Sequence, residues 1–272
     1  MNTLRTRYRR LAESSRQKHP LSFPTLLWLF IAGSLMGFVM EGVWHLLRTG
    51  AWGFRVATLW GPFCIIYGAG AVVMYLIALR VEGKRHLRQF LAFALAGSAV
   101  EYLSSLFQEA AFGTVSWDYS HHPFNLGGRI SLRMTLLWGV CGMALMYLLL
   151  PVALSVFNCL QLGSRPLLCR AAAAFMCVNL LWTGVALLRW QERVSTAAPA
   201  GNAVEAWMDH RWPDERMRER FPNMVFPHAD DASSPVPSDP EGTFLCLSCK
   251  KDAGNAYSDA NGGCIQGKPV VN

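Results

Sequence analysis

The stretch MTLLWGVCGMALMYLLLPVALSVF, residues 134–157, is apolar almost throughout and carries no charged side chain. A helix rises about 1.5 Å per residue, so a run of this length can cross a hydrocarbon core of roughly 30 Å. The stretch therefore predicts a transmembrane helix, and it places the chain among integral membrane proteins.

The composition of the whole chain agrees with that class of protein. Of its 272 residues, 52% are hydrophobic and 16% are charged, whereas soluble domains carry roughly a quarter charged residues. The first apolar run is too long for a cleaved signal peptide, so we expect a retained helix. The sequence predicts an all-α polytopic membrane protein with about five transmembrane helices, at 24–47, 56–79, 87–108, 134–157 and 167–188.

Lysine and arginine residues are unevenly distributed between the two sides of these spans. Twelve lie in the N-terminal arm and in the second and fourth connections, and six lie on the other side. Because basic residues are retained in the cytoplasm, we expect a cytoplasmic N-terminus and an extracytoplasmic C-terminal tail. The net charge of +7 is explained by contact with the lipid bilayer, so no nucleic acid partner is predicted.

The chain divides into three parts by composition. A basic cytoplasmic arm covers 1–23, a transmembrane helical domain covers 24–190, and a polar tail covers 191–272. We expect little order in the tail, apart from a candidate amphipathic helix at 204–220 lying on the membrane surface.

Three cysteines lie in that tail. An oxidising side of the membrane favours a disulfide among them, and unpaired thiols or a zinc site that lacks one ligand remain alternatives. The candidates are Cys246, Cys249 and Cys264.

A short internal repeat relates the first and third spans. Gly37-Phe-Val-Met-Glu41 corresponds to Gly97-Ser-Ala-Val-Glu101, and a Trp-Gly pair follows each, as Trp60-Gly61 and Trp138-Gly139. Both copies would run in the same direction across the membrane, as in a parallel repeat. A chance match of short motifs is the alternative.

The two glutamates predict a polar site within the membrane. A carboxylate in a bilayer is costly unless it is paired or wetted, so both should face the bundle interior. Polar residues at helical spacing extend the same faces. The predicted site comprises Glu41, His45, Arg48, Glu101, Ser105 and Gln108. Hydrogen bonds between helices, without further function, are the alternative reading.

The connection WDYSHHPFNLGGRI, residues 117–130, is rich in aromatic, polar and turn-forming residues. We expect the 113–132 loop to fold as an ordered lid over the polar helix ends, with a pair between Asp118 and Arg129. Adjacent histidines in an extended stretch point to opposite sides, so no metal site and no cofactor are predicted. The predicted lid residues are Trp117, Asp118, Tyr119, Asn125 and Arg129.

Several of these segments together resemble the ABC-transporter type IV family, the CmpB-type integral membrane permeases of bacteria. The resemblance rests on the first G-x-x-x-E, on RVATLWGPFCIIYGAGA at 55–71, on EYLSSLFQEAAFGTVSWDYSHHPFNLGGRISL at 101–132, and on LWG at 137–139. It covers about residues 25–160, and it implies transport and a multi-pass location in the bacterial cytoplasmic membrane.

Three functions compete at this point. The first is a permease or transport-associated subunit, and the second is a non-catalytic assembly or partner protein. The third is an integral-membrane enzyme acting on lipid-linked substrates, with Glu41 and His45 as an acid/base pair. No nucleophile beside a base stands out, so catalysis is not expected. No G-x-x-x-x-G-K-[ST] motif occurs, so any ATP hydrolysis would need a separate subunit. A homo-oligomer is the other expected partnership.

Overall fold

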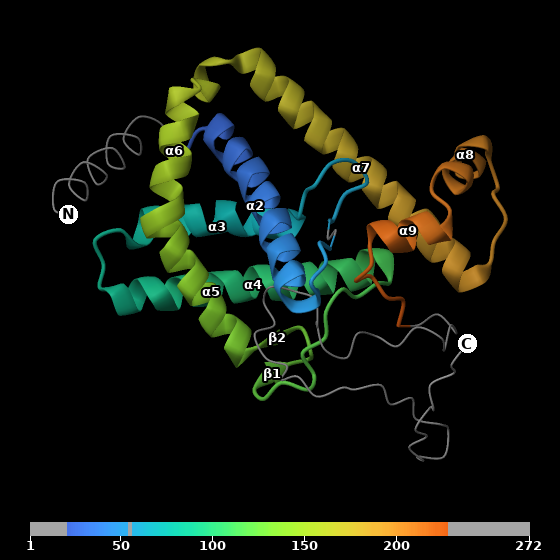
Figure 1. Cartoon of the computed structure of the whole chain (residues 1–272), viewed down its shortest axis with the longest axis horizontal. Coiled ribbons are helices and arrows are strands. Elements are labelled where there is room, and N and C mark those ends of the chain that lie inside the picture. Colours follow the sequence, from blue (N-terminus) through green and yellow to red (C-terminus); the bar gives the residue numbers. More distant parts are fainter. Residues whose placement is uncertain (1–20, 54–55, 228–272) are drawn as a thin grey trace, which may run out of the picture.

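The computed structural model describes residues 21–53 and 56–227, which are mostly helical (Figure 1). The elements in chain order are α2 (Phe23–Thr49), α3 (Ile65–Val81), α4 (His86–Phe112), β1 (Asn125–Leu126), β2 (Ile130–Ser131), α5 (Leu132–Ala144), the π-helical turn η1 (Leu145–Leu149), α6 (Leu150–Cys159), the 3-10 turn η2 (Leu162–Ser164), α7 (Pro166–Thr196), α8 (Ala203–Arg211) and α9 (Asp214–Arg220).

Four helices of the described chain are long and apolar enough to cross a membrane. They are α2 with 27 residues, α4 with 27, the continuous run Leu132–Cys159 with 28, and α7 with 31. The all-α polytopic fold expected from the sequence is confirmed, with four such helices and a shorter apolar one. The shorter helix is α3, which has 17 residues and corresponds to the second predicted span, at 56–79.

The second predicted span is shorter than expected because its first nine residues are not helical. Residues 56–64 form an irregular segment before α3 begins at Ile65. Within that segment Gly61 has φ of 77°, and Pro62 follows it. Proline has no backbone N–H and disfavours a helical residue before it, so hydrophobicity alone does not make this segment a helix.

Local sequence sets the other helix boundaries. Ser22 caps α2, since its hydroxyl accepts a hydrogen bond from the Thr25 amide at 3.4 Å, and α2 ends at Gly50 with φ of 75°. In the last part of the long run, Pro151 stands inside a helix and cannot donate to the preceding turn. The π-helical turn η1 lies immediately before this position, which is where such a turn can absorb the missing hydrogen bond.

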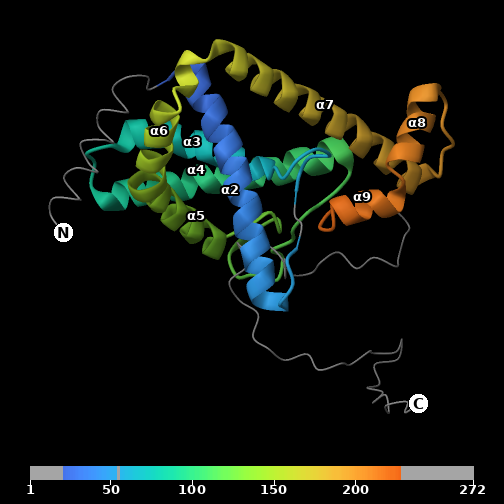
Figure 2. The same ribbon diagram turned by 45° about the horizontal axis from the view of Figure 1, so that its top comes forward.

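The helices do not all share one direction. In both views α3 and α4 lie side by side, while α2 and the α5–α6 run cross them (Figures 1 and 2). The most extensive helix contacts are between α2 and α3, between α4 and α5, and between α3 and α4. Helix α7 returns from the end of α6 toward the end of α4, where α8 and α9 lie.

The α2–α3 and α4–α5 pairs pack through equivalent positions. Phe30 and Phe90 each lie eleven residues before a glutamate, and each contacts a glycine of the next helix. A Cβ added to Gly68 would lie 2.6 Å from the Phe30 carbonyl oxygen, and one added to Gly139 would lie 2.6 Å from the Phe90 ring. The internal repeat is therefore a repeat of helix pairs, with glycines at matching contacts.

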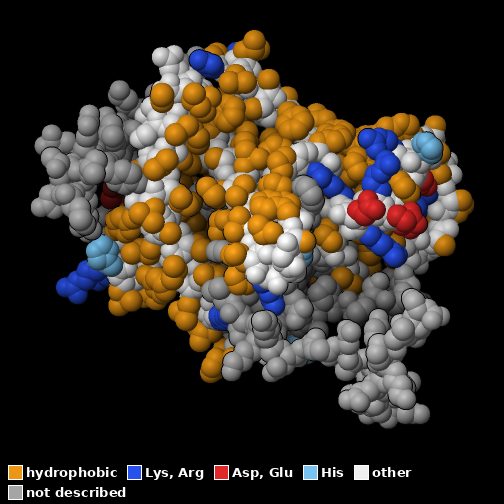
Figure 3. Space-filling model, viewed as in Figure 1, with side chains coloured by type: hydrophobic (Ala, Val, Ile, Leu, Met, Phe, Trp, Pro, Cys, Tyr) orange, Lys and Arg blue, Asp and Glu red, His pale blue; other side chains and the backbone are white. Residues whose placement is uncertain are grey.

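The outer surface has two chemically different parts. Figure 3 shows hydrophobic side chains over the helices of the transmembrane domain, whereas Lys, Arg, Asp and Glu side chains gather over α8 and α9. The exposed apolar residues include Leu47, Leu95, Val140 and Leu181, at 75%, 69%, 57% and 72%. Exposed apolar area on this scale belongs to a protein embedded in a membrane.

The beginning of the polar tail is ordered, in contrast to the low order expected from residue 191 onward. Helix α7 continues to Thr196, and α8 and α9 follow it. Of the three side chains expected on the membrane surface, Trp212 and Met217 are instead buried in a cluster with α7. The third, Trp207, is 50% exposed. Cys246, Cys249 and Cys264, like the basic arm before residue 21, lie outside the described residues.

Ion pairs fix α8 to α7. Arg189 on α7, whose side chain is 3% exposed, donates to Asp209 on α8 at 2.7 Å, and Arg193 donates to the same carboxylate at 2.5 Å. The hydrogen bond from Arg189 lowers the pKa of Asp209 below its ordinary value, against the opposing effect of burial. The sequence pattern missed this docking because the partners are charged residues in a segment of low hydrophobicity.

Candidate functional site

Glu101 is the most enclosed carboxylate of the described chain, with 0% of its surface exposed. One of its oxygens accepts a hydrogen bond from the Tyr119 hydroxyl at 2.7 Å, and the other accepts from the Trp138 indole Nε1 at 2.5 Å. The glutamate comes from α4, the tryptophan from α5 and the tyrosine from the loop between them. Each of these hydrogen bonds offsets part of the hydration that the carboxylate loses on burial.

Glu41 occupies the equivalent position on α2 and is 2% exposed. Its carboxylate accepts a hydrogen bond from the Tyr67 hydroxyl of α3 at 2.5 Å. An aromatic donor on the following helix thus contacts the glutamate in both helix pairs.

The glycine of each Gly-x-x-x-Glu motif makes room for that aromatic ring. A Cβ on Gly37 would lie 2.4 Å from the Tyr67 ring, and one on Gly97 would lie 2.5 Å from the Trp138 ring. The ring can therefore cross the helix one turn before the glutamate and present its donor to the carboxylate. Gly-x-x-x-Glu and the aromatic residue form one unit, which occurs twice.

This arrangement corrects the second half of the predicted repeat. Trp60-Gly61, which the sequence paired with Trp138-Gly139, lies in the irregular segment before α3. The Trp60 amide instead donates to Asn179 of α7 at 3.2 Å. Tyr67, not Trp60, is the residue equivalent to Trp138. The equivalent positions hold two different aromatic residues, so an alignment of identical residues does not detect the match.

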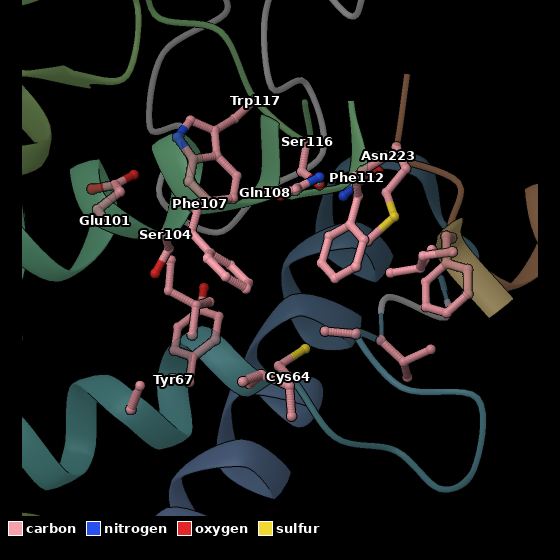
Figure 4. Close-up of a pocket in the computed structure, with 18 of the residues that line it drawn as sticks. Cys64, Tyr67, Glu101, Ser104, Phe107, Gln108, Phe112, Ser116, Trp117 and Asn223 are labelled. Atoms are coloured by element: carbon pink, nitrogen blue, oxygen red, sulfur yellow. Dashed lines mark hydrogen bonds between the residues drawn. The ribbon is translucent and has the colours of Figure 1, made fainter. Parts of the chain in front are cut away.

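Both glutamates line one cavity of about 510 Å³. Its walls come from α2, α3, α4 and α7, from the segment 56–64, from the loop residues Ser116, Trp117 and Tyr119, and from the segment 221–224 after α9. In Figure 4, Tyr67 rises from α3 toward Ser104 and Phe107 of α4, and Gln108, Phe112 and Ser116 lie farther along the same wall. The cavity joins the two repeat units to α7 and the C-terminal segment.

Most of the cavity lining is apolar or aromatic. The aromatic members are Tyr67, Phe107, Phe112, Trp117, Tyr119 and Phe221. Among the described lining residues, Glu41 and Glu101 carry the ionisable carboxylates, and Ser104, Gln108, Ser116 and Asn223 add neutral polar groups. A few polar groups on an apolar wall are typical of a site for a small organic molecule.

The other predicted site residues are divided between this cavity and its edge. Gln108 lines the cavity and donates to Ser116 at 2.7 Å and Thr114 at 3.1 Å. Ser105 accepts a hydrogen bond from Arg129 at 3.1 Å and lies outside the described lining. The polar face of α4 is thus used by the loop as well as by the cavity.

His45 and Arg48 lie beyond Glu41 near the end of α2, and the described lining does not include them. The His45 ring packs on the chain that follows α2, since a Cβ on Gly53 would lie 2.4 Å from it. The Arg48 guanidinium lies 5.9 Å from the centre of the Trp44 ring. These two residues were predicted in the site, but they are not brought together with Glu101.

The 113–132 loop is held by its own side chains. Asn125 donates to the carbonyl oxygens of Ser120 at 3.0 Å and His122 at 2.8 Å, and it accepts from the Gly128 amide at 3.1 Å. The Trp117 indole donates to the Arg129 carbonyl at 3.1 Å. These contacts carry Tyr119 to Glu101 and Trp117 to the cavity.

The expected pair between Asp118 and Arg129 is wrong. Asp118 accepts from the Ser120 amide at 2.8 Å and from the Ser120 hydroxyl at 2.5 Å. Arg129 pairs with Glu109 at the end of α4. Asp118 is better placed to close a local turn, as aspartate commonly does in loops, and α4 supplies the carboxylate for Arg129.

Four residues that matter here were missed from the sequence: Tyr67, Glu109, Trp138 and Arg220. The predicted repeat includes Trp138, but sequence spacing does not indicate that its partner is Glu101, and Glu109 lies one residue past the predicted third span. Arg220 donates to the carbonyl oxygens of Thr58 at 2.9 Å and Gly61 at 2.6 Å, across a separation that no local pattern reports. Within the described chain, no group of three or more His, Cys, Asp or Glu is placed to hold a metal ion.

Comparison with known proteins agrees with the membrane fold. A family model described as “Putative ABC-transporter type IV” matches residues 28–184, which is more than half of the 272 residues. The match continues past the range of the resemblance noted above and into α7, and it contains both repeat units. No curated protein and no solved structure matched the chain. The chain therefore belongs to the ABC-transporter type IV family and is a membrane-embedded, transport-associated protein.

Proposed function

We propose that this protein is a membrane permease or transport-associated subunit whose cavity between α3, α4 and α7 is the solute site. The observation that carries the proposal is that Glu41 and Glu101, from two equivalent helices, both line one largely apolar cavity. Buried carboxylates are costly in a membrane domain, and such residues are commonly part of a substrate or ion pathway.

The proposal assigns the cover of the site to two segments. The 113–132 loop contributes Ser116, Trp117 and Tyr119, and residues 221–224 contribute the opposite border. The two segments are joined beside these residues, since Val115 and Val225, which follows 221–224, exchange backbone hydrogen bonds of 2.9 Å. Displacement of this contact would open the cavity without unfolding a transmembrane helix.

Energy for transport would come from another subunit. The sequence contains no G-x-x-x-x-G-K-[ST] motif, and ATP-driven transport requires such a phosphate-binding loop on some chain. The proposed contact for an ATPase is the basic turn at 80–88 between α3 and α4. The distribution of basic residues supports a bacterial cytoplasmic membrane location with this turn and the N-terminus in the cytoplasm.

Filling the cavity tests the proposal directly. Gly184 of α7 lines the cavity, and a Cβ there would meet nothing nearer than Phe112 at 3.9 Å. Gly184→Leu should therefore occupy the cavity without distorting the helices, and Gly184→Ala is the matched control. Native mass spectrometry of the full chain in lipid nanodiscs should detect small molecules retained by the wild type and the alanine variant and lost from the leucine variant. Retention that is unchanged by Gly184→Leu would contradict a solute site here.

A further inference from the structure

We propose that the solute of this cavity is a monovalent organic cation with aromatic or branched apolar substituents, bound with its charge toward Glu101. This inference rests on the proposed function, because it names the class of molecule that the same cavity takes.

The first support is the chemistry around Glu101. Both hydrogen bonds to its carboxylate come from neutral groups, the Tyr119 hydroxyl and the Trp138 indole. Each carboxylate oxygen can accept a second hydrogen bond or face a positive charge. The two neutral donors offset only part of the free energy that burial of an ionised carboxylate costs. A cation in the cavity would stabilise the ionised carboxylate further.

Within the described residues, no lysine, arginine or histidine contacts this carboxylate. The basic side chain of the loop, Arg129, is engaged by Ser105 and Glu109. The described lining of the cavity contains no basic residue, and its charged members are both glutamates. An anionic solute would therefore meet like charges, whereas a cationic one would meet complementary charge.

The aromatic walls favour the same class of molecule. Phe107, Phe112 and Trp117 line the space beyond Glu101 (Figure 4), and the Trp117 ring is held by its bond to the Arg129 carbonyl. The faces of aromatic rings attract cations, and they also pack against apolar substituents. A volume of about 510 Å³ lies within the usual range for sites of drug-sized molecules.

A divalent metal cation fits this cavity poorly. Ca²⁺ and Mg²⁺ take about six or more oxygen ligands, and the described lining offers few oxygens on a mainly apolar wall. An organic cation carries its own apolar shell, so it needs one charge partner and a hydrophobic enclosure.

Three probes of similar shape test the inference on the full chain in lipid nanodiscs. Tetraphenylphosphonium is cationic, tetraphenylborate is anionic and triphenylphosphine oxide is neutral. We expect the wild type to bind the cation about tenfold or more tightly than either of the others, measured by equilibrium dialysis against empty nanodiscs. Gly184→Leu should remove this binding. Equal affinity for the cation and the anion would overturn the inference.

Glu101→Gln locates the charge partner. It should weaken tetraphenylphosphonium binding about tenfold and leave triphenylphosphine oxide binding unchanged, because shape is kept and charge is lost. Glu215→Gln on exposed α9 is the matched control and should change neither. Unchanged cation binding in a folded Glu101→Gln protein would overturn the inference. If this variant does not fold, the comparison of the three probes on the wild type still decides.

The two proposals fail in different ways. If a neutral or anionic molecule is retained in the wild type and lost from Gly184→Leu, the cavity is a solute site and the cation assignment is wrong. If no molecule and no probe depends on Gly184, the solute site itself is wrong.

Discussion

The α2–α3 and α4–α5 helix pairs build the same unit but complete it in different ways. In each, a glycine lets an aromatic ring cross the helix and donate to a glutamate one turn later. In the second pair, the loop between α4 and α5 provides Tyr119 as a second donor to Glu101. The repeat thus supplies the buried carboxylates, and the connecting segments determine how each is enclosed.

The two connecting segments are also held differently. The 113–132 loop is organised by its own Asn125 and Asp118. The segment at 56–64 is held from outside, by Asn179 and Thr183 of α7 and by Arg220 of α9. The 56–64 segment is therefore tied to α7 and α9, whereas the part of the loop at 118–128 is closed by its own side chains.

The largest effect is expected from removing the aromatic ring of the second unit. Trp138 is 4% exposed, so Trp138→Ala should lower the free energy of unfolding by about 3–5 kcal/mol, because it leaves a cavity and takes a donor from Glu101. Thermal unfolding in detergent measures the loss. Trp207→Ala, at a half-exposed tryptophan on α8, should cost much less. A small loss of stability in Trp138→Ala would show that this ring does not hold the second unit together.

Adding one methyl group tests whether the two units are equivalent. Gly37→Ala and Gly97→Ala should each cost about 1–3 kcal/mol of stability, since either Cβ would overlap the aromatic ring. Gly70→Ala is the control, because its Cβ would lie at an ordinary 3.5 Å from Trp138. A double-mutant cycle between Gly97→Ala and Trp138→Ala should be strongly non-additive. Strict additivity would show that Gly97 and the Trp138 ring do not interact.

Removing one hydroxyl tests the difference between the units. Tyr119→Phe leaves Glu101 with one donor, and a buried acceptor that loses a partner costs about 1–3 kcal/mol. The loss should appear in thermal unfolding and should be smaller in a Glu101→Gln background if the hydroxyl acts through the carboxylate, because a neutral amide oxygen is a weaker acceptor. Tyr102→Phe, next to Glu101 on α4, is the control. An equal loss in both backgrounds would assign Tyr119 a packing role instead.

The two connecting segments should respond to different mutations. Arg220→Ala removes the two hydrogen bonds that Arg220 donates to the 56–64 segment. Hydrogen exchange should therefore accelerate at the amides of Leu59 and Trp60 and stay unchanged at 117–130. Asn125→Ala should give the reverse pattern. Arg216→Ala, an exposed neighbour that contacts the Arg211 carbonyl, is the control for Arg220. Parallel changes in both segments would show that they form one unit.

The smallest effect concerns pH. A lowered pKa of Asp209 means that its pairing stabilises the fold above the ordinary pKa of aspartate, about 3.9, and that this contribution is lost as the pH falls through the lower folded value. Below about pH 4 the docking of α8 should weaken by less than about 1 kcal/mol, since the Asp209 side chain is 27% exposed and solvent screens its charge. Exchange at Leu59 should rise before exchange at 117–130. Asp209→Asn should remove this dependence on pH.

The membrane class, the apolar helices and the Gly-x-x-x-Glu motifs can all be predicted from the sequence, because hydrophobic length and helical spacing are local properties of the chain. It also placed Glu41 and Glu101 on the inward faces, from the cost of burying charge in lipid. Their function as a site stays a prediction.

The hydrogen-bond and ion-pair partners of these side chains depend on how the helices pack. Tyr67 rather than Trp60 matches Trp138, Arg129 pairs with Glu109 rather than Asp118, and α8 and α9 dock on α7 through buried methionines and ion pairs. Each of these depends on which side chains meet after the helices cross. A hydrogen bond or ion pair forms with whatever group arrives at the right distance, and sequence spacing does not encode that distance across separate helices.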